Sequence, residues 1–316
     1  MDVAPAILYW QAAFYLAAAT ATRIPAPLTL LLMASTALIP TLFETTNAMR
    51  CMHGMATITH GLRLVRIVES PECFSQRSAM FRIAFCAHFH DLSRLGNSLK
   101  RTGALRSLVL TTLGAVGATV LASSGLMYLG GVGPMYLGRG GLLLRWACGA
   151  VKFAASMYIL DGLYRLPLLA MGKSVPAALQ NPQSSNTVAE FWSRRWNLVI
   201  GGMLREGIFE PCRRWGLNGH LAAALTFVTS GLLHVVPMVL SRQPIDVCAC
   251  MFLFFVAQIP LLAVERALGL RGTAWVWLAL AAVAPLFVES FLRCFDPDGA
   301  DERLPMSVVL LYFVGV

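Results

Sequence analysis

The stretch LAAALTFVTSGLLHVVPMVL, residues 221–240, contains no Asp, Glu, Lys or Arg and a single histidine, His234. A membrane-spanning helix needs about 20 mostly apolar residues, so this stretch is long enough to cross the hydrocarbon core of a bilayer. An imidazole in apolar surroundings is costly and is by default a candidate functional group. The stretch therefore predicts a transmembrane helix with a chemically active side chain inside it.

Similar apolar runs recur along the 316-residue chain and decide the fold class. Of all residues 57% are hydrophobic and only 13% are charged, against about 25% charged residues in a soluble domain. This composition excludes soluble, disordered and fibrous proteins. We expect an all-α, polytopic integral membrane protein that folds as one domain over residues 1–316. Its membrane-embedded helices should number about eight, near residues 6–22, 25–43, 107–128, 142–171, 220–240, 247–264, 273–292 and 304–316.

The net charge of +9 comes mainly from arginine, because lysine occurs only at positions 100, 152 and 173. These basic residues lie mostly between or at the ends of apolar runs, a pattern typical of the positive-inside rule and of contact with anionic headgroups. A nucleic-acid partner is not expected. The mixed segment 44–106 is interpreted as cytoplasmic, with helices that lie at the interface. The eight cysteines are scattered, so neither a disulfide framework nor a metal site is predicted.

A second polar stretch, Glu190-Phe-Trp-Ser-Arg-Arg-Trp-Asn197, stands out against this background. Read as one helix, it places Trp192 and Trp196 on one side and Arg194 and Asn197 on another. One interpretation is an interfacial anchor, because Trp and Arg favour the headgroup region. The other is that these side chains belong to a functional site.

His234 also has two interpretations. Burial disfavours the charged imidazolium, so the side chain should be neutral and able to accept a proton. The alternative is a structural histidine bonded to a neighbouring helix. His88 and His90 give a weaker signal, because residues two apart on a helix point away from each other, and an exposed polar segment is expected there.

Together the two stretches carry a family resemblance. The block EFWSRRWNLV, residues 190–199, followed by SGLLH, residues 230–234, resembles the wax synthase branch of the membrane-bound O-acyltransferase (MBOAT) superfamily. The similarity covers a core of about residues 182–265. It implies an MBOAT-like helical bundle in which His234 is the catalytic residue and Asn197 is the second polar residue of the active site.

The resemblance also implies a reaction. We expect an acyl-CoA-dependent O-acyltransferase that moves an acyl group, from acetyl to long-chain, to a fatty alcohol, sterol or terpenoid. His234 would act as general base and Asn197 would orient a substrate or stabilise the oxyanion. Acyl-CoA is a co-substrate, and no bound cofactor is expected. If the chain is eukaryotic, the endoplasmic reticulum is implied. The residues expected to support the motif or to bind the CoA phosphates are Trp192, Arg194, Arg195, Trp196, Arg205 and Ser230.

Two other classes remain open at this point. An isoprenoid or terpene cyclase or isomerase would protonate its substrate with a buried carboxyl group of Asp161, Glu265 or Glu289, which lie in or near apolar runs. A transporter or structural membrane protein would show no turnover, but the sequence has no inverted repeat that favours a transporter.

Overall fold

The computed structural model describes residues 71–87, 90–97, 101–130 and 138–295, with scattered residues before residue 69. The runs predicted at 6–22, 25–43 and 304–316 lie wholly or mostly outside the described residues. In the described part, the helices are α4 (Pro71–Ser75), α5 (Ala79–Ala87), α6 (Arg101–Gly130), α7 (Gly138–Ala170), α8 (Val188–Glu190), α9 (Leu198–Leu204), α10 (Glu210–Arg214), α11 (Gly219–Leu240), α12 (Ile245–Val256), α13 (Gln258–Ala267) and α14 (Thr273–Phe295).

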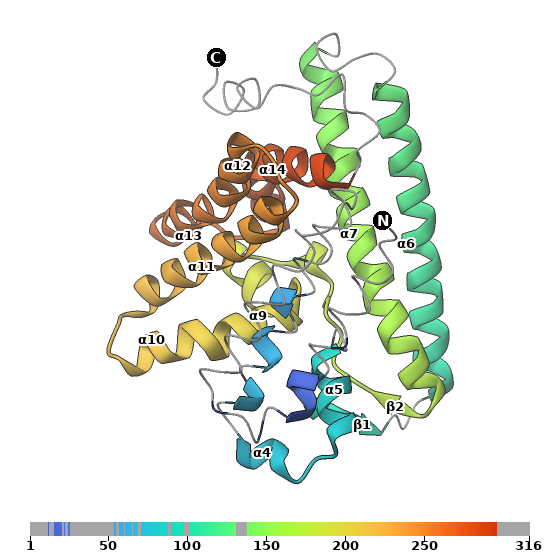
Figure 1. The fold of residues 1–316 in the computed structure, drawn as a ribbon. Helices are drawn as coiled ribbons and strands as arrows, with labels where there is room; N and C mark the ends of the chain where they lie inside the picture. Colours follow the sequence, from blue (N-terminus) through green and yellow to red (C-terminus); the bar gives the residue numbers. More distant parts are fainter. Residues whose placement is uncertain are drawn as a thin grey trace.

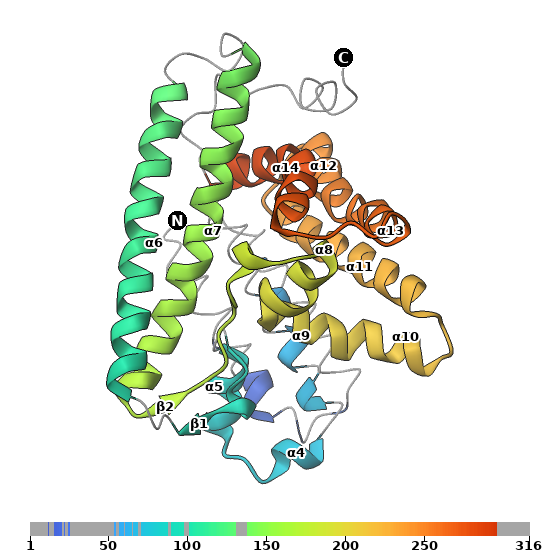
Figure 2. The same ribbon diagram turned by 180° about the vertical axis from the view of Figure 1, so that it is seen from behind.

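The longest helices, α6 and α7, stand side by side along one flank of the molecule (Figures 1 and 2). They contain 30 and 33 residues, so at 1.5 Å per residue they extend for about 45 and 50 Å. They are longer than a hydrocarbon core of about 30 Å, and their ends therefore reach the headgroup region. The short strands β1 (Gly96–Asn97) and β2 (Lys173–Ser174) pair antiparallel and tie the segment before α6 to the chain that leaves α7.

Five stretches of the described chain are long and apolar enough to cross a membrane: Gly103–Gly130, Gly138–Ala170, Gly219–Leu240, Ile245–Ala267 and Thr273–Cys294. Each coincides with a run predicted from the sequence, which confirms the all-α, multi-pass membrane class. The total of about eight helices stays a prediction, because the other three runs lie largely outside the described residues.

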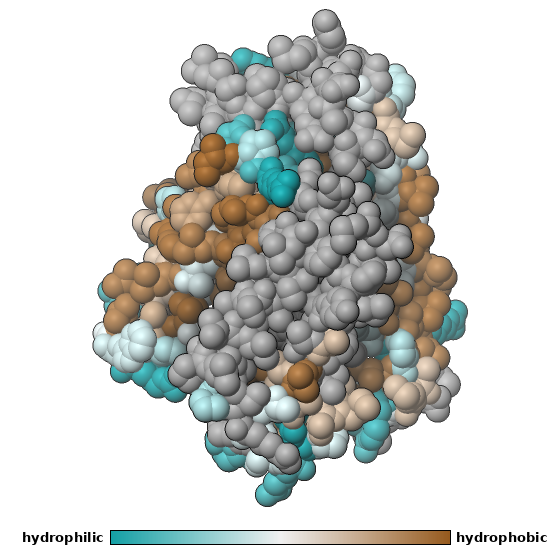
Figure 3. Space-filling view, in the orientation of Figure 1, coloured by the Kyte–Doolittle hydropathy of each residue, from teal (hydrophilic) through white to brown (hydrophobic). Residues whose placement is uncertain are grey.

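Large apolar side chains are exposed on the outer faces of these helices. Leu113 and Leu121 on α6 and Leu278 on α14 are 62%, 75% and 68% exposed, as expected where lipid replaces water as the solvent. Figure 3 shows hydrophobic residues along both flanks and hydrophilic residues at the end where α4 lies. The molecule therefore has apolar sides and a polar end.

The run 247–264 does not form one helix, as the sequence suggested, but two, α12 and α13, which meet at Ala257. Pro260 lies in the first turn of α13. It has no N–H to donate to the carbonyl of Val256, and its ring disfavours helical geometry in the preceding residue. The interruption places Gln258 at the start of a new helix inside the bundle.

Helices α7 and α14 pack closely where Gly149 faces Val288. A Cβ on Gly149 would lie 2.3 Å from Val288 Cγ1, so only glycine permits this approach. Next to it, Glu289 of α14 accepts hydrogen bonds from Arg145 Nε at 2.8 Å and from Trp146 Nε1 at 3.0 Å. This buried ion pair fixes the two helices on one side of the cavity described below.

Candidate active site

The segment 190–197 is not the single helix that the sequence predicted. Helix α8 runs into a π-helical turn, Phe191–Arg195, and the chain then leaves the helix at Trp196, with φ −101° and ψ 128°. Asn197 adopts the left-handed conformation, with φ 41° and ψ 57°, and caps α9 because its Oδ1 accepts the N–H of Ile200 at 3.4 Å. Asparagine tolerates this conformation better than most residues, so the break is encoded at Asn197.

Two backbone hydrogen bonds hold this break in place. The N–H of Gln180 donates to the carbonyl of Arg195 at 2.9 Å, and the N–H of Leu198 donates to the carbonyl of Ala178 at 2.8 Å. The N–H of Ala178 in turn donates to Asp161 Oδ1 at 2.8 Å. A buried carboxylate on α7 is thus connected, through one loop residue, to the turn that presents Asn197.

The other end of the motif is held by Glu265 of α13. Its carboxylate accepts the N–H groups of Val188 at 2.5 Å and Ala189 at 3.3 Å, which are first-turn donors of α8 without helical partners. Trp275 Nε1 donates to the same carboxylate at 2.9 Å. The motif is therefore anchored at both ends by carboxylates from other helices.

These contacts bear on the cyclase alternative. Asp161 also accepts from His90 Nε2 and Arg165 Nη1, each at 2.8 Å, and Glu289 pairs with Arg145. Asp161, Glu265 and Glu289 are thus all engaged as buried acceptors, and none lines the cavity. His90 is only 1% exposed, so the expectation of an exposed polar segment there was wrong; His88 lies outside the described residues.

A cavity of about 410 Å³ lies between the motif and helices α7, α11, α12 and α14. Most of its wall is apolar and aromatic, with Phe254 and Phe255 of α12 among the lining residues. The predicted site residues that line it are Trp192, Trp196, Asn197, Arg205, Ser230 and His234. The structure therefore brings together residues from the two sequence stretches that are far apart in the chain.

His234 is oriented for proton acceptance. Its Nδ1 lies 2.7 Å from the carbonyl oxygen of Ser230, and a carbonyl can only accept, so Nδ1 carries the hydrogen. Nε2 then has a lone pair, and no described protein group bonds to it. The ring packs against Phe255 with centroids 4.2 Å apart, which fixes its plane.

Asn197 offers the complementary group. Because its Oδ1 faces the N–H of Ile200, its amide NH₂ is left as a donor. The cavity lining therefore includes an acceptor on His234 and a donor on Asn197, in mainly apolar surroundings.

Arg194 and Arg195 do not line this cavity. Arg195 donates to Glu190 Oε1 at 2.7 Å and to Ser184 Oγ at 2.9 Å, so it braces the loop against the motif. The backbone N–H of Asn186, with Arg195, holds the pKa of Glu190 below its usual value. Arg194 is exposed.

One polar residue that supports the cavity wall from behind, Gln258, was not predicted. Gln258 is fully buried and accepts a hydrogen bond from Trp192 Nε1 at 3.1 Å, while its own amide donates to the carbonyl of Phe254 at 3.0 Å. The only sequence signal was an amide inside the apolar run 247–264. Phe254 and Phe255 gave no signal, because phenylalanine in such a run is ordinary.

Known proteins resemble this chain, and a family model matches the region of the site. Residues 175–257 match the family model described as membrane bound O-acyl transferase family. Two relatives from Arabidopsis thaliana are named probable long-chain-alcohol O-fatty-acyltransferase 2, 31% identical over 94 residues, and probable long-chain-alcohol O-fatty-acyltransferase 9, 32% identical over 83 residues. Another, acyl-CoA--sterol O-acyltransferase 1 from the same plant, is 37% identical over 59 residues.

The alignments are partial. They cover 27%, 24% and 17% of this chain and the same shares of the three relatives, so the chain spans about a quarter or less of the length of these relatives. The region that the family model matches, residues 175–257, holds both the 190–199 block and the 230–234 block. These findings confirm the resemblance to the wax synthase-like branch of the MBOAT superfamily.

Proposed function

We propose that this protein transfers an acyl group from acyl-CoA to the hydroxyl group of a lipophilic alcohol. The observation that carries the proposal is that His234 and Asn197 line one apolar cavity, with a free lone pair on the first and a free amide on the second. The acceptor classes that fit are fatty alcohols, sterols and terpenoids. The names of the relatives, which include long-chain-alcohol and sterol acyltransferases, support the first two.

The reaction follows from these two side chains. Nε2 of His234 accepts the hydroxyl proton while the alcohol oxygen attacks the thioester carbonyl carbon. The amide of Asn197 donates to the oxyanion that forms on the carbonyl oxygen. When the C–S bond breaks, the imidazolium returns the proton to the leaving thiolate, which gives the ester and free CoA. The Ser230 carbonyl stabilises the imidazolium through Nδ1–H.

The surroundings suit both substrates. An apolar alcohol and an acyl chain fit the aromatic wall, whereas Arg205 is an exposed arginine at the cavity lining and can bind phosphate. In a multi-pass membrane protein the alcohol reaches the cavity from the lipid and CoA reaches it from water. If the chain is eukaryotic, the resemblance supports the endoplasmic reticulum membrane as its location.

The test compares the wild type with His234→Ala and Asn197→Asp in purified membranes. A panel of acyl-CoAs and lipophilic alcohols is supplied, and free thiol and ester are measured together by mass spectrometry. We expect His234→Ala to lose roughly 10²- to 10⁴-fold in ester formation. Asn197→Asp keeps the cap oxygen but loses the donor, and should lose about 10²- to 10³-fold.

The matched control is His220→Ala. His220 lies at the start of the same helix, is exposed and does not line the cavity. Its removal should leave the rate unchanged. Ester formation by His234→Ala at the wild-type rate would refute the general-base assignment, and no ester with any donor would refute the proposed activity.

A further inference from the structure

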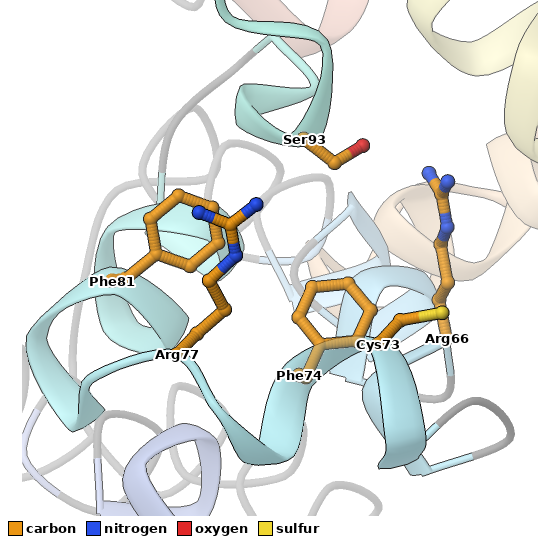
Figure 4. Close-up of a pocket in the computed structure, with 6 residues that line it drawn as sticks. All are labelled: Arg66, Cys73, Phe74, Arg77, Phe81 and Ser93. Carbon is orange, nitrogen blue, oxygen red and sulfur yellow. The ribbon is translucent and has the colours of Figure 1, made fainter.

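A second, smaller cavity of about 230 Å³ lies at the polar end of the molecule. It is lined by Arg66, Cys73, Phe74, Arg77, Phe81 and Ser93. Figure 4 shows the guanidinium groups of Arg66 and Arg77 on either side of the Phe74 ring. The proposed reaction uses none of these residues. We refer to this cavity as the basic pocket.

Among the described residues, the arginines around the basic pocket outnumber the carboxylates that pair with them. Arg66 pairs with Asp91 at 2.7 Å and lies 3.6 Å from Glu206, but Arg94 shares both carboxylates. Arg77 lies over the Phe81 ring at 4.9 Å, and no carboxylate among the described residues pairs with it. Among the described residues, Asp91 and Glu206 thus pair with Arg66 and Arg94, and no carboxylate pairs with Arg77.

A buried arginine, Arg82, adds to the positive charge next to the basic pocket. Arg82 is 5% exposed and donates to the backbone carbonyls of Phe74 at 3.3 Å, Arg77 at 2.6 Å and Ala19 at 2.5 Å. These acceptors are neutral, so they satisfy its hydrogen bonds without cancelling its charge. The same bonds fix the turn between α4 and α5 that carries Arg77. The pocket is therefore both positive and preorganised.

Asp91 responds to this environment. Its partial burial alone would raise its pKa, but the hydrogen bonds from Ser93 and Arg66, with the charge of Arg66, hold the pKa below its ordinary value. The Asp91 carboxylate therefore stays ionised, and its oxygens are occupied by Ser93, Arg66 and Arg94. Because no described carboxylate pairs with Arg77, that arginine is the one to bind an added anion.

The basic pocket and the active-site cavity border the same segment, Arg205–Glu206. Arg66 lines the pocket and lies 3.6 Å from Glu206, and the residue before Glu206 is Arg205, which lines the larger cavity. A ligand with a reactive group in one cavity and an anionic group in the other would pass along this segment.

We propose that the basic pocket binds a phosphate ester, and we assign this group to the 3′-phosphate of the CoA nucleotide; this assignment rests on the proposed function. Arginine matches phosphate in geometry and charge. The partly buried Phe81 ring, beside Arg77, provides apolar surface for the base. In acyl-CoA a flexible arm joins the thioester to the nucleotide. The two ends of the molecule can therefore occupy two separate cavities.

The experiment measures binding rather than turnover. The full chain is placed in phosphatidylcholine nanodiscs, and CoA and dephospho-CoA, which lacks the 3′-phosphate, are titrated by calorimetry. We expect Arg77→Gln to weaken CoA binding by roughly tenfold, the effect of one charge-assisted hydrogen bond, and to change dephospho-CoA binding by less than about twofold. Arg77→Lys should retain part of the CoA affinity, because the charge remains.

Arg106→Gln is the matched control, because Arg106 is an exposed arginine on α6 outside the pocket. It removes the same charge and should leave both affinities unchanged. If Arg77→Gln binds CoA as tightly as the wild type, the pocket assignment fails while the acyltransferase proposal stands, since the His234 experiment tests the latter separately. If Arg77→Gln binds CoA as tightly as the wild type but, once reconstituted in nanodiscs that contain phosphatidic acid, binds that lipid less, the ligand is a lipid headgroup and the assignment to CoA is overturned.

Discussion

Asp161 connects the bundle to the turn that carries Asn197, and its replacement by alanine should damage both stability and rate. The side chain is 4% exposed and accepts three hydrogen bonds of 2.8 Å, from His90, Arg165 and the N–H of Ala178. Breaking a buried ion pair from one side costs about 3–5 kcal/mol, so Asp161→Ala should lower the free energy of unfolding by about that amount. Asp161→Asn keeps an acceptor for Ala178 and loses the charge, so about 1.5–3 kcal/mol is expected.

The assay follows urea-induced unfolding in detergent, with kcat and KM measured on the folded protein. Because Ala178 also accepts the N–H of Leu198, a loosened loop should displace Asn197 and lower kcat more than it raises KM. The control is Asp246→Ala, which removes an exposed carboxylate at the start of α12 and should change neither quantity. If Asp161→Ala shifts the unfolding midpoint no more than Asp246→Ala does, the reasoning is refuted.

Two further predictions concern packing and pH. Gly149→Ala should destabilise the protein by about 1–3 kcal/mol in thermal unfolding, because the new Cβ would overlap Val288. The control is Gly140→Ala on the same helix, whose Cβ would meet nothing within 4 Å. It should be tolerated in the same measurement. The pKa of Asp91 is lowered in the folded protein. Its ionised carboxylate therefore stabilises the fold above the unfolded-state pKa of 3.8. This stabilisation is lost as the pH falls through the lower pKa of the folded state. Wild-type unfolding midpoints should therefore fall more steeply below about pH 4 than those of Asp91→Asn, and parallel curves would contradict the role given to its bond with Arg66.

The membrane helices could be predicted from the sequence because hydropathy is a property of each run by itself. The run 220–240 became α11 at Gly219–Leu240, and 273–292 became α14 at Thr273–Phe295. Helix α6 begins at Arg101, earlier than the predicted residue 107. Hydropathy marks where the apolar residues begin, whereas a helix extends beyond the hydrocarbon core as long as its backbone bonds are satisfied.

The partners of the buried charges could not be predicted in this way. Asp161, Glu265 and Glu289 were noted as carboxyl groups in or near apolar runs. Their contacts depend on residues far along the chain, such as His90 for Asp161 and Val188 for Glu265. No local pattern encodes a contact across 71 or 77 positions. The cyclase interpretation remained open for that reason, and the carboxylates' engagement away from the cavity now counts against it.

The break at Asn197 shows why the motif has its particular residues. If the predicted helix over residues 190–197 had formed and continued into α9, the side-chain oxygen of Asn197 would have no N–H to cap and α9 would continue in the direction of α8. The left-handed turn at Asn197 instead uses that oxygen on Ile200 and leaves the amide as a donor in the cavity that holds His234. A residue that can adopt this conformation, accept from the backbone and still donate to a substrate must carry a short side-chain amide. Aspartate meets the first two requirements only, so the asparagine is explained by the fold and by the proposed chemistry together.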